Sequence, residues 1–154
     1  MDMLTALAVS VAVLLAVWVK VTAVTGTAWF VGAIGWACYS AAGGKTEGLK
    51  KAIAAGIAGM IWVGVAYMIL LMSGHPELEW LGLGVVAFLI IIEAKVRLLS
   101  FIPAALCGAA IIGAGGVVAV FDLASNIKVA VTFAVGAVVG YIAEWAGGML
   151  TKKA

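Results

Sequence analysis

Two carboxylates, Glu93 and Glu144, stand inside long apolar stretches of this 154-residue chain. A charged side chain in a bilayer is costly, so an intramembrane carboxylate is a candidate for binding or transport. Arg97 follows Glu93 by four positions and predicts a self-contained ion pair on one helical face. Glu144 has no basic residue at that spacing. It predicts either a group that attracts a cation or accepts hydrogen bonds from a polar solute, or an interface carboxylate bonded to backbone or to a neighbouring lysine.

The surroundings of Glu144 favour a helix interface or a cavity over lipid. Thr132, Gly136, Gly140, Glu144 and Gly148 follow one another at intervals of four residues. Small residues at this spacing let the backbone of another helix approach closely. The carboxylate would therefore point toward a neighbouring helix.

The elements that position these groups are membrane helices. Hydrophobic residues make up 66% of the chain and charged residues 10%, against about 45–50% and about 25% in soluble domains. We predict an all-α membrane protein, with residues 1–154 forming one transmembrane domain of six hydrophobic helical segments. The apolar run after Asp2 lacks the basic start of a signal peptide and is expected to be the first span. The segments cover about 3–23, 27–43, 52–72, 80–98, 102–120 and 127–149, and polar loops are expected at 45–51, 73–79 and 122–126.

The placement of lysine and arginine gives an orientation. Basic residues cluster at 45–51, at 95–100 and in the C-terminal tail, and short loops rich in them prefer the cytoplasm. We therefore expect both termini to be cytoplasmic and the loop at 73–79 to face outside.

The two halves of the chain resemble each other. Residues 30–44 and 102–116 are apolar, rich in small residues and close on a glycine pair. Biased composition can produce such likeness by chance. A true duplication would give half-repeats at 1–72 and 79–151, and three spans in each half would make this a 3+3 inverted repeat. Paired short, glycine-interrupted segments then point to the site, and four ordinary spans would surround them.

The leading functional hypothesis is a passive channel or facilitator for a small polar solute of the water, urea or ammonia class. The alternatives are an ion-coupled transporter or exporter of a small cation that uses Glu144 or Glu93, and a membrane scaffold whose glycines only let helices pack. The predicted path is framed by Ser40, Gly43, Gly44, Pro103, Gly115 and Gly116, with Glu93 and Glu144 near its cytoplasmic mouth.

Other classes of function lack their motifs. There is no P-loop, no dinucleotide fingerprint and no nucleophile–His–Asp set, so catalysis is not expected. Cys38 and Cys107 are interpreted as small buried hydrophobic residues, since two cysteines and one histidine are too few ligands for a zinc site. We expect no metal, no cofactor and no nucleic acid. The expected partners are the lipid bilayer, a small polar solute and further copies of the chain, because six short spans are few to wall a pore.

Two segments resemble the YcdZ-like family of small bacterial inner-membrane proteins. They are WACYSAAGGKTEGLKKA at 36–52 and KVRLLSFIPAALCGAA at 95–110. The resemblance implies a multi-pass protein of the bacterial inner, or cytoplasmic, membrane. The function of that family is unknown, so no site residue follows from it.

Overall fold

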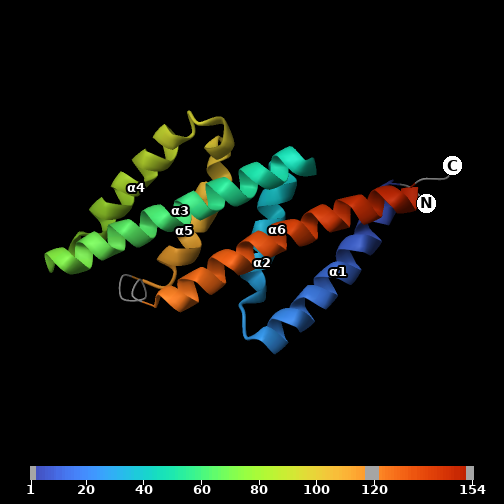
Figure 1. Ribbon diagram of the computed structural model, residues 1–154, viewed down its shortest axis with the longest axis horizontal. Coiled ribbons are helices and arrows are strands. Elements are labelled where there is room, and N and C mark those ends of the chain that lie inside the picture. The colour runs from blue at the N-terminus through green and yellow to red at the C-terminus, as the bar shows by residue number, and fades with distance from the viewer. Residues whose placement is uncertain (1–2, 117–121, 152–154) are drawn as a thin grey trace.

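The computed structural model describes residues 3–116 and 122–151, and within them the chain forms six α-helices and two short 3-10 helices (Figure 1). The expected all-helical class is confirmed. The elements in chain order are α1 (Met3–Thr25), α2 (Trp29–Ala41), α3 (Lys45–Ser73), η1 (Pro76–Leu78), α4 (Glu79–Glu93), η2 (Arg97–Leu99), α5 (Ile102–Gly113) and α6 (Leu123–Thr151).

Helix length separates the six helices into two groups. Three of those described are long and apolar enough to cross a membrane: α1, with 23 residues, and α3 and α6, with 29 each. The others are α2 with 13 residues, α4 with 15 and α5 with 12, fewer than the roughly 20 residues that a span needs. The expectation of four ordinary spans is therefore one too high, because α4 ends at Glu93 instead of continuing to residue 98.

Two segments expected to be polar loops are helical instead. Residues 45–51 form the first turns of α3, which begins directly after Gly44. Asp122 accepts a hydrogen bond from the Ser125 backbone N–H at 3.1 Å, so its carboxylate caps the start of α6 at Leu123. In both places the helix extends beyond the apolar segment. The predicted fifth span is also shorter, because α5 ends at Gly113, and residues 117–121 lie outside the described ones.

Glycines bring α2 against α6. A Cβ atom added to Gly136 would overlap the carbonyl oxygen of Gly32, and one added to Gly35 would overlap that of Phe133. The two backbones therefore touch without side chains between them. The expected role of the small residues in α6 as a close-packing face is confirmed at Gly136.

The same kind of contact joins α3 to α5. A Cβ atom on Gly59 would overlap the carbonyl oxygen of Ala105, and one on Gly108 would overlap that of Gly56. The short helices α2 and α5 thus each cross one of the long helices backbone to backbone. These two crossings form the buried core of the molecule, to which Val31, Ala55, Ala104, Ala105, Phe133 and Ala137 contribute.

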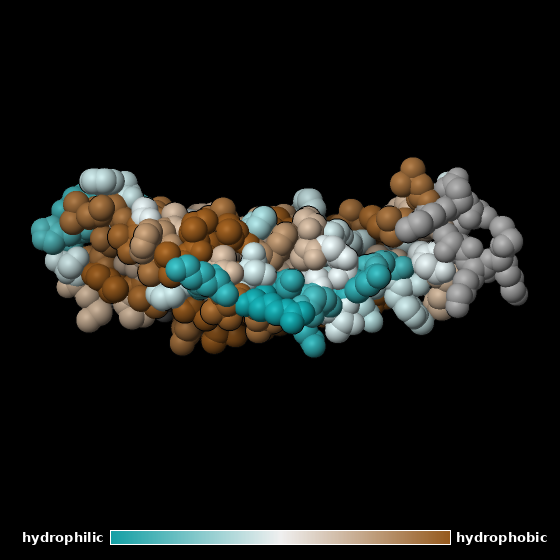
Figure 2. All heavy atoms as spheres, turned by 90° about the horizontal axis from the view of Figure 1, so that it is seen from above, coloured by the Kyte–Doolittle hydropathy of each residue, from teal (hydrophilic) through white to brown (hydrophobic). Residues whose placement is uncertain are grey.

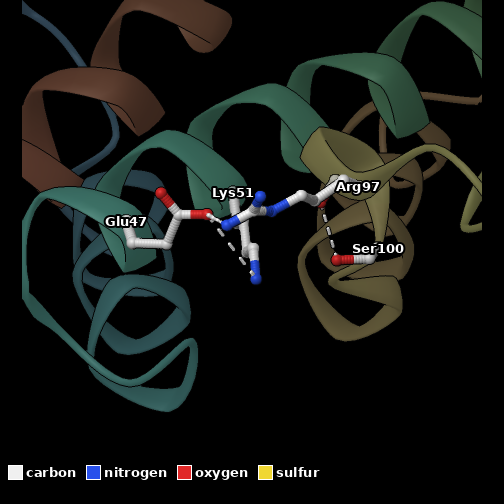
Figure 3. A network of polar contacts seen from close by, with 4 residues as sticks. All are labelled: Glu47, Lys51, Arg97 and Ser100. Carbon is white, nitrogen blue, oxygen red and sulfur yellow. Dashed lines mark hydrogen bonds and ion pairs between the residues drawn. The ribbon is translucent and has the colours of Figure 1, made fainter.

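The helix ends lie on two sides of the molecule. On the first, which we call the basic side, Arg97 of η2 lies 3.6 Å from Glu47 of α3, and Lys51 lies 3.9 Å from the same carboxylate (Figure 3). Figure 2 looks onto this side and shows hydrophilic side chains gathered in its middle. The Ser10 hydroxyl also donates to the Ala143 carbonyl, so the first part of α1 runs beside the last part of α6.

The opposite side carries the other ends of these helices. The Lys128 ammonium near the start of α6 donates to the Gly26 carbonyl, after the end of α1, at 3.1 Å. The helices α1 and α6 are therefore antiparallel over their length. Much of their surface is apolar and exposed, as lipid contact requires.

We expect Arg97→Gln to lower the free energy of unfolding by less than about 1 kcal/mol, because exposed ion pairs are weak. The Arg97 side chain is 89% exposed. The unfolding midpoint of the purified variant in detergent measures the effect, with Lys95→Gln as the matched control. A loss of folded protein in the Arg97 variant alone would contradict this prediction.

Candidate functional site

A cavity of about 520 Å³ opens between α1, α2 and α6. Four of the residues predicted from the sequence line it together: Ser40, Gly43, Gly44 and Glu144. We call it the Glu144 cavity. It lies on the basic side, since the backbone of Lys45 at the start of α3 borders the same carboxylate. Its remaining wall is largely apolar and includes Trp36.

Neutral hydrogen-bond donors hold the Glu144 carboxylate. The Tyr39 hydroxyl donates to Oε2 of Glu144. The Lys45 backbone N–H donates to the same Oε2 at 3.2 Å and to the Tyr39 hydroxyl oxygen at 2.9 Å. Among the described residues no lysine or arginine side chain forms an ion pair with Glu144. The carboxylate is thus positioned by dipoles, and its charge stays available to a ligand.

A backbone turn aims the Lys45 N–H at this carboxylate. Gly43, Gly44 and Lys45 follow one another with φ values of 93°, 66° and 55°. Only glycine adopts such angles at little cost, which explains the glycine pair after α2. A Cβ atom on Gly44 would also overlap the Glu144 carboxylate. The glycine pair therefore serves both the turn and the close approach of Glu144.

The other residues of the predicted path lie elsewhere. Pro103 is exposed in the first turn of α5. The backbone N–H that proline lacks has no partner within the helix at this position. Gly115 and Gly116 follow the end of α5, and Gly116 has a φ of 72°. None of the three lines the Glu144 cavity. The structure thus brings together only the half of the predicted set that belongs to α2 and α6.

Glu93 has a different partner from the one expected. The Trp62 indole N–H donates to its Oε2 at 2.6 Å, while its Oε1 is buried with no hydrogen-bond partner. Because α4 ends at Glu93, Arg97 does not lie one turn further along the same helix, and it contacts Glu47 instead. The predicted Glu93–Arg97 pair is therefore wrong.

Sequence reasoning missed a second polar pair. The Tyr67 hydroxyl donates to Glu79 Oε1 at 2.6 Å and lies 3.5 Å from the Gly113 carbonyl oxygen. All three residues line a cavity of about 340 Å³ between α3, α4 and α5, which we call the Glu79 cavity. Glu79 follows Pro76 so closely that it was assigned to a solvated loop, whereas it is the first residue of α4.

Both cysteines are free, and they are neighbours. The Cys38 thiol of α2 is near enough to the Cys107 thiol of α5 to interact with it electrostatically. Cys38 is 5% exposed and belongs to the core, as expected for a small buried hydrophobic residue. The pair places α2 and α5 side by side in the fold.

Lipid-exposed apolar helices around a small, sparsely polar interior define a polytopic helical membrane protein. The chain belongs to the DUF1097 family of proteins of unknown function, whose model matches residues 8–148. It is 35% identical over 120 residues to the inner membrane protein YcdZ of Escherichia coli strain K12, a match that covers 75% of this chain and 72% of YcdZ. No solved structure matches the chain. The predicted family and the multi-pass inner-membrane location are confirmed.

Proposed function

We propose that this protein transports a small organic ammonium ion across the inner membrane through the Glu144 cavity. The observation that carries the proposal is an accessible carboxylate at a cavity of about 520 Å³, whose hydrogen-bond donors among the described residues are the neutral Tyr39 hydroxyl and Lys45 N–H. A carboxylate without a charged partner is expensive in a membrane unless a cationic ligand neutralises it. The role is transport, and no catalytic step is proposed.

The cavity wall favours an organic cation over a metal ion. Leu7, Val11 and Trp36 give it apolar surface, and a tryptophan ring attracts a cation to its face. No group of three or more potential metal-ligating side chains occurs in the described residues. A cation with hydrocarbon substituents satisfies both the carboxylate and the wall.

We further propose that the halves 1–72 and 79–151 form an inverted repeat, which would suit transport by alternating access. The contact of Gly136 in α6 with Gly32 in α2 has its counterpart in Gly59 of α3 with Ala105 of α5. The contact of Gly35 with Phe133 corresponds in the same way to that of Gly108 with Gly56. In such a repeat, the long helix α3 corresponds to α6, and the short helix α2 corresponds to α5. Such halves suit a carrier that rocks one half against the other.

The two cavities also favour a carrier over an open channel. The Glu144 cavity is lined by α1, α2 and α6, and the Glu79 cavity by α3, α4 and α5, with no residue in common. A passive channel for a neutral solute stays a prediction, as does a homo-oligomer. We place the basic side in the cytoplasm, together with both termini, because of its lysines and arginine.

Uptake of radiolabelled tetramethylammonium into proteoliposomes tests the proposal. This ion keeps its charge at every pH and cannot leak as a neutral base. We expect Glu144→Gln to slow uptake by about tenfold or more, because it removes the charge that neutralises the ion. Glu47→Gln is the matched control, since Glu47 lies on the same side but outside the cavity, and it should transport like the parent chain.

The outcomes separate the three hypotheses. Urea flux that Glu144→Gln leaves unchanged, without ammonium uptake, would overturn the proposal in favour of a passive channel. No flux of either solute above that of protein-free vesicles would overturn both transport hypotheses and favour the membrane scaffold.

A further inference from the structure

We propose a second binding site for the same small ammonium ion in the Glu79 cavity, on the side of the membrane opposite to Glu144. The proposal rests on the proposed function for the class of ligand, but its geometry is independent. It makes Glu79 and Tyr67 the polar groups of an outer vestibule, and the ion would meet this vestibule before or after the Glu144 cavity.

Three oxygen atoms converge in the Glu79 cavity. They are the Glu79 carboxylate, the Tyr67 hydroxyl oxygen 2.6 Å from it, and the Gly113 carbonyl oxygen 3.5 Å from that hydroxyl. Tyr67 is 1% exposed, so its hydroxyl is fixed by the surrounding core, and Glu79 is half-buried. Gly113 is the last residue of α5, and a helix C-terminus carries a partial negative charge. All of these features stabilise a cation.

The Glu79 cavity occupies the position in its half that the Glu144 cavity occupies in the other. Gly136 of α6 corresponds to Gly59 of α3 through their equivalent backbone contacts. Eight residues further along each helix stand Glu144 and Tyr67, and each lines its own cavity. A Tyr–Glu hydrogen bond is therefore present at equivalent places in both halves, although different helices supply the carboxylate.

The short helices give the same correspondence. Gly35 of α2 corresponds to Gly108 of α5, and five residues further on stand Ser40 and Gly113. Both of these line the cavities, so each cavity lies at the C-terminal end of a short helix. The agreement of two independent helix pairs makes coincidence a poor explanation of the second cavity.

The charge of the loop before α4 supports attraction of a cation. The segment 73–79 contains Glu77 and Glu79 but no lysine or arginine. Glu77 is exposed and is bonded to His75 at 2.8 Å, outside the cavity. An entrance lined by one sign of charge concentrates ions of the other sign.

Equilibrium dialysis of the purified chain against radiolabelled tetramethylammonium tests the second site without relying on transport. We expect one bound ion for each cavity in the parent chain. Glu79→Gln should remove one, Glu144→Gln the other, and the double variant both. Tyr67→Phe keeps the ring in the core but removes the hydrogen bond that positions the Glu79 carboxylate, and it should weaken the outer site by about tenfold, as expected for the loss of one hydrogen bond to a charged group.

Glu77→Gln is the matched control, because it removes a neighbouring charge outside the cavity, and it should bind like the parent chain. Unchanged binding in both Glu79→Gln and Tyr67→Phe would overturn the second site, even if Glu144→Gln abolished transport. Loss of an ion only in Glu79→Gln and Tyr67→Phe, with Glu144→Gln binding and transporting like the parent, would support the second site and overturn the proposed function. If Glu77→Gln reduced binding as much as Glu79→Gln, the ion would only be attracted to surface charge, and the second site would be overturned too.

Discussion

A chain carrying Gly59→Ala is expected to unfold under conditions in which the parent chain stays folded. The added methyl group would overlap the Ala105 carbonyl oxygen, which belongs to the backbone of α5 and cannot rotate away. The two helices would have to separate, and the neighbouring contact between Gly108 and Gly56 would loosen with them. We expect a cost of about 3 kcal/mol or more, at the upper end of the usual effect of overpacking. The fraction of protein that stays monodisperse after heating in detergent measures it.

Gly64→Ala provides a control in the same helix. Nothing lies within 4 Å of the Cβ position at Gly64, and alanine favours a helix over glycine by up to about 1 kcal/mol. This variant should be as stable as the parent chain or more so. Equal thermal survival of the two alanine variants would contradict the backbone contact between α3 and α5.

Joining Cys38 to Cys107 is expected to reduce transport to the background of protein-free vesicles. The two thiols are already neighbours, so oxidation by oxygen and copper phenanthroline should form a disulfide without large backbone movement. The bond would fix α2 of one half to α5 of the other. A carrier whose halves must move against each other would then stop, and reduction with a thiol should restore uptake. Tetramethylammonium uptake before and after oxidation, with the intact mass to count the disulfide, measures both steps.

Cys38→Ser, treated in the same way, controls for other effects of the oxidant and should keep its transport. Complete disulfide formation with undiminished uptake would contradict movement of α2 against α5. Failure of the disulfide to form at all would contradict the adjacency of the thiols.

The apolar segments could be located from the sequence, but the boundaries of the helices that contain them could not. Membrane helices are apolar on the lipid face and on the packed face, so hydropathy does not reveal which part of a helix is buried in protein. Residues 45–51 are polar and were therefore assigned to a loop, although the helix α3 already begins at Lys45. The short length of α4 was hidden as well, since no glycine or proline follows Glu93 before Pro103.

The candidate site was predictable where one helix carried the pattern. The spacing of small residues in α6 led to Glu144, and the glycine pair after α2 led to Gly43 and Gly44, which lie together. The opposite cavity was missed because its polar groups come from three helices at positions without any periodic signal. Tyr67 looked like a core residue and Glu79 like a loop residue, and only their 2.6 Å hydrogen bond relates them.

The shortness of α2 and α5 has an electrical consequence. Their 13 and 12 residues span only about 20 Å at the usual rise for each residue, against roughly 30 Å of hydrocarbon. Water that follows a cavity to the end of each short helix carries the bulk potential inward with it. The membrane voltage then falls across a thin septum between the two cavities, and one charge still gains about 2.3 kcal/mol for each 100 mV. A small displacement of an ion, or of a helix that holds one, would therefore be driven by nearly the whole membrane potential.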